Sequence, residues 1–283
     1  MGTGRFKYML EQEILSKSVR PLLIRLAPLF LRQSLAIRFF RNRPNLFHLY
    51  RDASLFLKPN VRMNLIPGDI ISDMIALTGM YEHKKAKRMA KLAEYGGVLV
   101  DVGANLGFFS LLWASQNFRC KVFSFEASPR NIELLKQNID CNAMGGQVTI
   151  YPVAVGHRPG KLDFEIGNIT QTGWGGFTQN KTDKSIRVEV VTLDNALAEI
   201  PQIDLLKIDI EGADFWAIQG CENLLRQGRV KEIWFEQNKP RARALGIPEN
   251  ASQDFLRSLG YFVFPESDPK KEMCDWIAVV EKK

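Results

Sequence analysis

The stretch VLVDVGANLGFFS, residues 98–110, sets an apolar run directly against an acid and two glycines and then returns to apolar residues. Such a run is typical of a buried strand, which here ends at Asp101. Gly103 and Gly107 indicate a tight turn that leads at once into a helix. A glycine turn between a strand and a helix lets the backbone approach a ligand, and the helix N-terminus supplies donors. We therefore predict that this turn contacts a nucleotide-sized ligand.

Beyond about residue 68 the chain alternates strands with helices, the pattern of a parallel α/β sheet. We expect strands near residues 98–102, 121–125, 148–153, 204–210, 230–236, 260–264 and 275–280. Residues 161–193 interrupt the alternation after the third strand, and they indicate a β insertion around a glycine-rich loop. The last two strands are joined without a helix. We therefore expect the final strand to run antiparallel at or near the sheet edge.

The basic residues are unevenly spread along the chain. With 283 residues, of which 46% are hydrophobic, the chain can bury a full core, which excludes a disordered protein. Residues 1–60 hold 11 Lys or Arg against three acids, which leaves 27 basic and 28 acidic residues in the remainder of a chain of net charge +7. The basic character therefore belongs to an N-terminal arm, which we place at residues 1–67, ahead of a main domain at residues 68–283.

The arm contains one long apolar stretch, residues 19–40, interrupted by Arg25 and Arg32. Each Arg at the centre of a membrane-spanning helix costs about 2.5–3.5 kcal/mol, so a membrane span is not expected. We expect a helical appendage that packs on the main domain or on a second copy of the chain, as in a homodimer. The alternative is peripheral contact with a membrane through basic amphipathic helices broken near Pro21 and Pro28.

The cysteines Cys120, Cys141, Cys221 and Cys274 show no CxxC spacing and no paired framework. We interpret them as reduced and mostly structural, which favours a cytoplasmic protein. The N-terminus has no short apolar core followed by a small-residue cleavage site, and this argues against a secretory signal.

The chain carries six motifs in a fixed order: DVGANLGFFS, FEASPRN, YPVAVG, VTLDNAL, LLKIDIEGAD and IWFEQN. Together they resemble the FkbM-type family of S-adenosylmethionine-dependent methyltransferases, from about residue 76 to the C-terminus. The resemblance implies a class I methyltransferase fold, which is a Rossmann-like, seven-stranded, mostly parallel sheet with helices on both faces. It also implies that S-adenosylmethionine binds at the carboxyl ends of the first two strands.

Carried onto this sequence, the resemblance assigns cofactor contacts to nine residues. Five of them would wrap the methionine end of the cofactor: Asp101, Gly103, Ala104, Asn105 and Gly107. Glu126, at the end of the second strand, would hold the ribose hydroxyls, and its spacing from the glycine turn suits such a contact. Ala154 and Val155 would lie near the adenine, and Glu82 near the ammonium group. Acids suit the cationic sulfonium because opposite charge stabilises a cation where water is excluded.

Three carboxylates, Asp209, Glu211 and Glu236, follow neighbouring strands, where parallel α/β proteins place their working residues. Methyl transfer requires the acceptor to lose a proton, so one of the three is the candidate base. His157 is a weaker candidate than these, because a loop histidine in water is the favoured interpretation. Asp209, Glu236 and Asn238 also form an alternative set of hard oxygen ligands for Mg²⁺ or Ca²⁺.

The acceptor side is less well specified. Trp174 lies among glycines and is predicted either to line the acceptor pocket or to pack the β insertion. The leading function is O-methylation of a hydroxyl on a small molecule or a sugar unit. An RNA methyltransferase that uses the basic arm is an alternative, although the arm lacks the aromatic platform that single-stranded RNA binding favours, and nucleic acid is not expected. A NAD-dependent oxidoreductase would prefer GxGxxG, which the turn at residues 103–107 does not provide.

Overall fold

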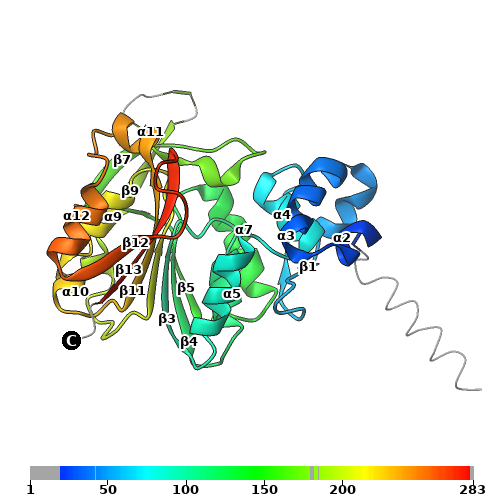
Figure 1. The fold of residues 1–283 in the computed structure, drawn as a ribbon, viewed down its shortest axis with the longest axis horizontal. Coiled ribbons are helices and arrows are strands. Elements are labelled where there is room, and N and C mark those ends of the chain that lie inside the picture. The colour runs from blue at the N-terminus through cyan, green and yellow to red at the C-terminus, as the bar shows by residue number, and fades with distance from the viewer. Residues whose placement is uncertain (1–19, 42, 179–181, 184, 281–283) are drawn as a thin grey trace, which may run out of the picture.

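The computed structural model describes residues 20–41, 43–178, 182, 183 and 185–280. Within these residues the chain forms a seven-stranded sheet in the order β12-β13-β11-β10-β3-β4-β5 (Figure 1). Its strands are β3 (Gly97–Val102), β4 (Cys120–Phe125), β5 (Val148–Tyr151), β10 (Leu205–Ile208), β11 (Glu232–Asn238), β12 (Tyr261–Pro265) and β13 (Met273–Val280). The strands from β5 to β11 are parallel neighbours, and β13 runs antiparallel to both β11 and β12. The predicted sheet, with its final strand antiparallel and next to the edge, is confirmed.

Successive residues of a strand point to opposite sides of the sheet, so both faces of this sheet carry apolar side chains. Helices cover both faces. Leu205 and Trp234 belong to one buried cluster, whereas their neighbours Leu206 and Phe235 belong to another. The first cluster packs under α5 (His83–Leu92), α6 (Phe108–Ala114) and α7 (Pro129–Asp140), and the second under α8 (Leu193–Ala196), α9 (Asp214–Gln219), α10 (Glu222–Arg226) and α12 (Ala251–Ser258). Figure 1 shows α9, α10 and α12 on one side of the sheet and α5 and α7 on the other.

The insertion predicted after the third strand is also confirmed. It consists of β6 (Ala154–Val155), β7 (Gly160–Glu165), the 3-10 turn η3 (Thr172–Trp174), β8 (Gly176–Phe177) and β9 (Ser185–Val191). These strands form a second sheet in the order β6-β9-β7-β8, in which β6 and β9 are parallel and β7 is antiparallel to β8 and β9. The glycine-rich loop with Trp174 therefore joins β7 to β8.

The N-terminal segment is largely helical and packs on the main domain. It contains α2 (Leu22–Leu26), α3 (Leu29–Leu35), the π-helical turn η1 (Ala36–Phe40), the 3-10 helix η2 (Pro44–Tyr50), β1 (Ala53–Ser54) and β2 (Arg62–Met63), and it leads into α4 (Ile70–Thr78). Ile24, Leu49 and Met63 are buried in the same cluster as residues of α4 and α6. Among the described residues, no helix is both long and apolar enough to cross a membrane.

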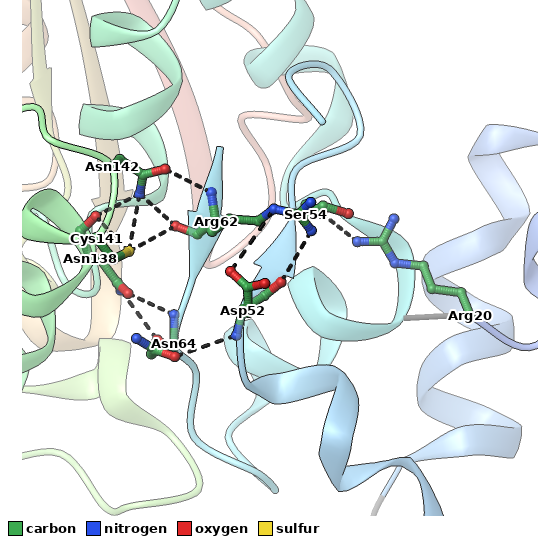
Figure 2. A network of polar contacts seen from close by, with 8 residues as sticks. All are labelled: Arg20, Asp52, Ser54, Arg62, Asn64, Asn138, Cys141 and Asn142. Atoms are coloured by element: carbon green, nitrogen blue, oxygen red, sulfur yellow. Dashed lines mark hydrogen bonds and ion pairs between the residues drawn. The ribbon is translucent and has the colours of Figure 1, made fainter. Parts of the chain in front are cut away.

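Two asparagine side chains form hydrogen bonds with the backbone of β2 and of the residue after β2 (Figure 2). They are Asn138 of α7 and Asn142, which lies just after α7. The amide of Asn142 accepts from the Arg62 N–H at 2.8 Å and donates to the Arg62 carbonyl at 2.7 Å. Asn138 accepts from the Asn64 N–H at 2.7 Å and donates to its carbonyl at 3.2 Å. At β1, the guanidinium of Arg20 donates to the Ser54 carbonyl. The segment is thus tied to the domain by polar contacts as well as apolar ones, while the division between residues 67 and 68 stays a prediction.

Candidate active site

A cavity of about 240 Å³ lies at the carboxyl ends of β3, β4 and β10. A single water molecule needs only about 10–15 Å³ on such a scale, so a far larger ligand fits. The lining includes most of the residues that the sequence predicted for the site: Gly103, Ala104, Asn105, Glu126, Ala154, Val155, Trp174, Asp209, Glu211 and Glu236. Four predicted residues, Glu82, Asp101, Gly107 and Asn238, are not part of this lining.

The turn after β3 needs glycine for steric reasons. Gly103 has a φ of 80°, and a Cβ built on it would lie 2.0 Å from the backbone oxygen of Asp209. Asn105 also has a positive φ, 51°, which Asn tolerates better than most residues. Gly107 is the N-cap residue of α6, where a Cβ would meet Leu135. The turn therefore packs tightly on the end of β10. Gly107 packs closely against Leu135 and does not line the cavity.

Glu126 fastens this turn to the end of β4. Its Oε2 accepts from the Asn105 N–H at 2.8 Å, and its Oε1 accepts from the Ser128 N–H at 2.8 Å. Burial raises the pKa of Glu126, and the backbone N–H groups oppose this rise. The carboxyl group is thus held in one orientation beside the glycine turn, at the edge of the cavity.

Several buried polar atoms of lining residues have no hydrogen-bond partner among the described residues. They are Asn105 Oδ1, Ser128 Oγ, Asn131 Oδ1 and Glu236 Oε1. Buried polar atoms in folded proteins are nearly always paired, so this set points to a polar ligand that completes them. The sequence analysis missed Ser128 and Asn131, although both lie in the FEASPRN motif directly after Glu126.

Asp101 lies behind the cavity wall, where it is fully buried. It accepts from Ser110 Oγ at 2.6 Å, and its Oδ1 lies 3.3 Å from Lys207 Nζ. Lys207 does line the cavity, and its Nζ is 3.5 Å from Asp209 Oδ2. Burial would lower the pKa of Lys207, but the charges of Asp101 and Asp209 outweigh it and raise that pKa. Asp101 therefore contacts the site through a buried ammonium group that the sequence analysis did not single out.

Glu82 also stands away from the lining. It is the N-cap residue of α5 with a φ of 43°, and it pairs with Lys85 at 3.0 Å. Lys85 in turn pairs with Asp275 at 2.6 Å. Burial raises the pKa of Glu82 although Lys85 opposes the rise. Its neighbour Tyr81 reaches the cavity instead.

The three predicted acids line the cavity together. Burial, followed by the charge of Asp209, raises the pKa of Glu211 to about 7, although Arg241 and Asn238 oppose the rise. The same two causes, with Asp214 and Glu211 next, raise the pKa of Glu236 to about 10. Burial and the neighbouring acids thus favour the protonated form of both carboxyl groups, and more strongly that of Glu236.

The metal alternative, with Asp209, Glu236 and Asn238 as ligands, stays a prediction. No group of three or more His, Cys, Asp or Glu side chains placed to hold a metal ion is found in the described part of the chain. Asn238 Nδ2 donates to Glu211 Oε2 at 2.9 Å, and its Oδ1 accepts from the Arg241 N–H at 3.4 Å at the start of α11 (Lys239–Ala244). Its amide is therefore engaged in capping α11.

The loop with Trp174 covers one side of the cavity and is tied down at two points. Asp69, the N-cap residue of α4, accepts from the backbone N–H of Thr172 at 2.8 Å and from its hydroxyl at 3.0 Å. On the other side Arg241 donates to the Trp174 carbonyl at 2.9 Å. The Trp174 residue lines the cavity and remains 52% exposed. His157, by contrast, lies outside this lining, beside Trp216.

Comparison with known proteins gives a family. The family model described as "Methyltransferase FkbM domain" matches residues 101–263. The hexuronic acid methyltransferase AglP of Haloferax volcanii is 28% identical over 138 residues, which cover 47% of this chain and 54% of AglP. The 31-O-demethyl-FK506 methyltransferase FkbM of Streptomyces tacrolimicus is 28% identical over 203 residues, 62% of this chain and 76% of that protein. The chain spans little more than half the length of the first of these curated relatives.

This chain is also similar to the solved structure of the methyltransferase FkbM from Methylobacillus flagellatus KT, with 13% identity and a TM-score of 0.46. The match covers 74% of this chain and 53% of the chain in that structure. The match to the family model spans more than half of the 283 residues and includes the glycine turn, Glu126 and the three acids. The predicted resemblance is thus confirmed, and it excludes the alternative prediction of a NAD-dependent oxidoreductase. The chain belongs to the FkbM methyltransferase family.

Proposed function

We propose that the protein is an S-adenosylmethionine-dependent O-methyltransferase that acts on a hydroxyl of a small molecule or a sugar unit. The observation that carries the proposal is the position of Glu126. Its carboxyl group accepts one hydrogen bond of 2.8 Å from Asn105 of the glycine turn and another of 2.8 Å from Ser128 after β4. The same cavity is lined by Asp209, Glu211 and Glu236. The proposed ribose contact and the candidate bases thus line one cavity.

The residues present fit the cofactor. Glu126 would accept from the ribose hydroxyls, and Ala154 and Val155 would contact the adenine. The side-chain oxygens of Asn105, Ser128 and Asn131 that have no partner among the described residues offer further polar contacts along the same wall. When bound, S-adenosylmethionine supplies a methyl group on a positively charged sulfonium. The acids of the cavity would favour that charge, since the attraction between opposite charges is stronger where water is excluded.

The acceptor hydroxyl must lose its proton during attack. A general base works best when its pKa lies near the operating pH, and the pKa of about 7 for Glu211 meets this condition. Protonated Glu236 can donate a hydrogen bond to the acceptor, while the carboxylate of Asp209 is held by Lys207. The half-exposed Trp174 would form the wall on the acceptor side. We propose that these side chains play these separate roles in methyl transfer.

The names of the relatives support the type of acceptor. One is named for a hexuronic acid and the other for an O-demethylated compound, so both names indicate oxygen-bearing acceptors. The predicted cytoplasmic location stays a prediction.

Two measurements test the proposal. Calorimetric titration should show binding of S-adenosylhomocysteine and none of NAD, and the Glu126→Ala variant should bind S-adenosylhomocysteine more weakly than the exposed control Glu133→Ala. A screen with a labelled methyl donor over hydroxyl-bearing small molecules, sugars and RNA should then give a labelled small molecule or sugar with the wild type. Binding of NAD, or labelled product confined to RNA, would contradict the proposal.

A further inference from the structure

The described N-terminal segment combines positive charge with exposed apolar side chains. Between residues 20 and 67 the sequence holds nine Lys or Arg and a single acid, Asp52. The basic residues are Arg20, Arg25, Arg32, Arg38, Arg41, Arg43, Arg51, Lys58 and Arg62. Exposed apolar residues of the same segment are Leu22, Leu23, Leu26, Leu31, Ile37, Phe39, Phe47 and Phe56. A large exposed apolar patch on a folded domain marks an interaction site.

The leucines of α2 form the clearest part of this surface. Leu22, Leu23 and Leu26 are 63%, 52% and 76% exposed, whereas Ile24 is 1% exposed. At about 100° per residue, the three leucines fall within an arc of about 100°, and Ile24 lies on the opposite side of the helix. α2 therefore buries one side against the protein and presents a leucine face outward.

Arg25 borders the leucine face, about 60° from Leu22 around the helix. It is exposed, and among the described residues it has no acidic partner. Arg32 of α3 donates to the backbone carbonyls of Arg25 at 2.8 Å and Ala27 at 2.9 Å, which fixes the turn between the two helices. Three leucines and a guanidinium with no acidic partner in the described part of the chain are thus exposed together on α2.

The chemistry of this surface selects its partner. A second copy docking by the same face would oppose two strongly basic segments, which repel each other. Single-stranded RNA favours exposed aromatic platforms, while the face of α2 is aliphatic. A bilayer with anionic headgroups offers both negative charge and an apolar layer, and it takes basic amphipathic helices in its interface. Helices of five and seven residues, such as α2 and α3, suit an interface and not a span.

We propose that the leucine face of α2, with Arg25, docks the protein on an anionic lipid surface. The docking face and the cavity are joined by one helix, because α2 and α3 contact α4, whose Ile71 and Met74 line the cavity. The inference rests on the exposed side chains alone and does not depend on the proposed function.

Co-sedimentation of the full-length protein with vesicles tests the proposal. The wild type should sediment with vesicles that contain phosphatidylserine and stay in solution with vesicles of phosphatidylcholine alone. Leu26→Glu should lower the partition coefficient about tenfold or more, because a leucine side chain that the bilayer would bury is replaced by a charge. Arg25→Glu should lower it as well, and added salt should weaken the binding of the wild type.

Two matched variants separate docking from general effects. Phe118→Glu places an acid at another exposed apolar residue, 84% exposed, and should leave sedimentation unchanged. Lys87→Glu reverses a charge on α5, as Arg25→Glu does on α2, and should also have little effect. Binding of S-adenosylhomocysteine by every variant confirms that each is folded, whatever its sedimentation.

Three results would overturn the proposal. The first is wild-type protein that does not sediment with anionic vesicles. The second is an equal loss in Leu26→Glu and Phe118→Glu, or in Arg25→Glu and Lys87→Glu, which would mean nonspecific attraction. The third is a dimer in lipid-free solution that Leu26→Glu dissociates, since the leucine face would then be covered by a second copy.

Discussion

Replacing Glu211 with Gln should stabilise the protein, and the gain should depend on pH. Burial and the charge of Asp209 raise the pKa of Glu211 in the folded protein from 4.5 to about 7. Between these two values the folded state keeps a proton that the unfolded chain has released. The stabilising effect of this proton is therefore complete below pH 4.5 and is lost as the pH rises through about 7.

The size of the effect follows from the two pKa values. The interval from 4.5 to about 7 corresponds to about 3 kcal/mol of unfolding free energy, at about 1.4 kcal/mol for each pKa unit. The glutamine side chain of the variant keeps an oxygen that can accept from Asn238 Nδ2, now 2.9 Å from Glu211, and it loses only the longer ion pair with Arg241 at 3.8 Å. As the pH rises from acid to mildly alkaline values, the unfolding free energy of the variant should thus increase by about 3 kcal/mol relative to that of the wild type.

Urea denaturation of the wild type and the variant at several pH values from about 4.5 to 8 measures this difference. Glu199→Gln is the matched control, because it makes the same change at an exposed residue, and its difference from the wild type should not vary in the same way. A stability difference between Glu211→Gln and the wild type that stays constant over this range would refute the reasoning, and so would a loss of stability that grows with pH.

Three further predictions concern the cavity. Glu126→Ala should weaken binding of S-adenosylhomocysteine by about 1–3 kcal/mol, the scale for a lost charged hydrogen-bond partner, and calorimetry that finds unchanged affinity would reject the ribose contact. Asp209→Asn should bind the cofactor nearly normally and lose most of its turnover in a methyl-transfer assay; activity that a chelator abolishes and Mg²⁺ restores would instead favour the metal alternative. Gly103→Ala should destabilise the fold by about 3 kcal/mol or more in denaturation, because its Cβ would lie 2.0 Å from the Asp209 oxygen, whereas Gly145→Ala, with no atom within 4 Å of its Cβ, should be tolerated.

The sequence by itself determined the order of strands and helices and the residues at the ends of β3, β4, β10 and β11. Both follow from local patterns, since apolar runs and glycine turns are read within a few residues. Because the carboxyl ends of parallel strands meet at one edge of a sheet, this local order was enough to bring Gly103, Glu126, Asp209 and Glu236 to one cavity.

Only the tertiary structure decided which polar groups face the cavity and which lie behind it. Asp101 lies near the end of β3 as predicted, but its carboxylate is fully buried against Lys207, and this pairing depends on the register of β3 beside β10. Burial likewise sets the pKa of Glu211, because desolvation depends on side chains brought close from distant parts of the chain. The outward leucine face of α2 has the same origin. A run of leucines and arginines in sequence does not tell which side of a short helix the rest of the protein will cover, and here the side that holds Ile24 was covered.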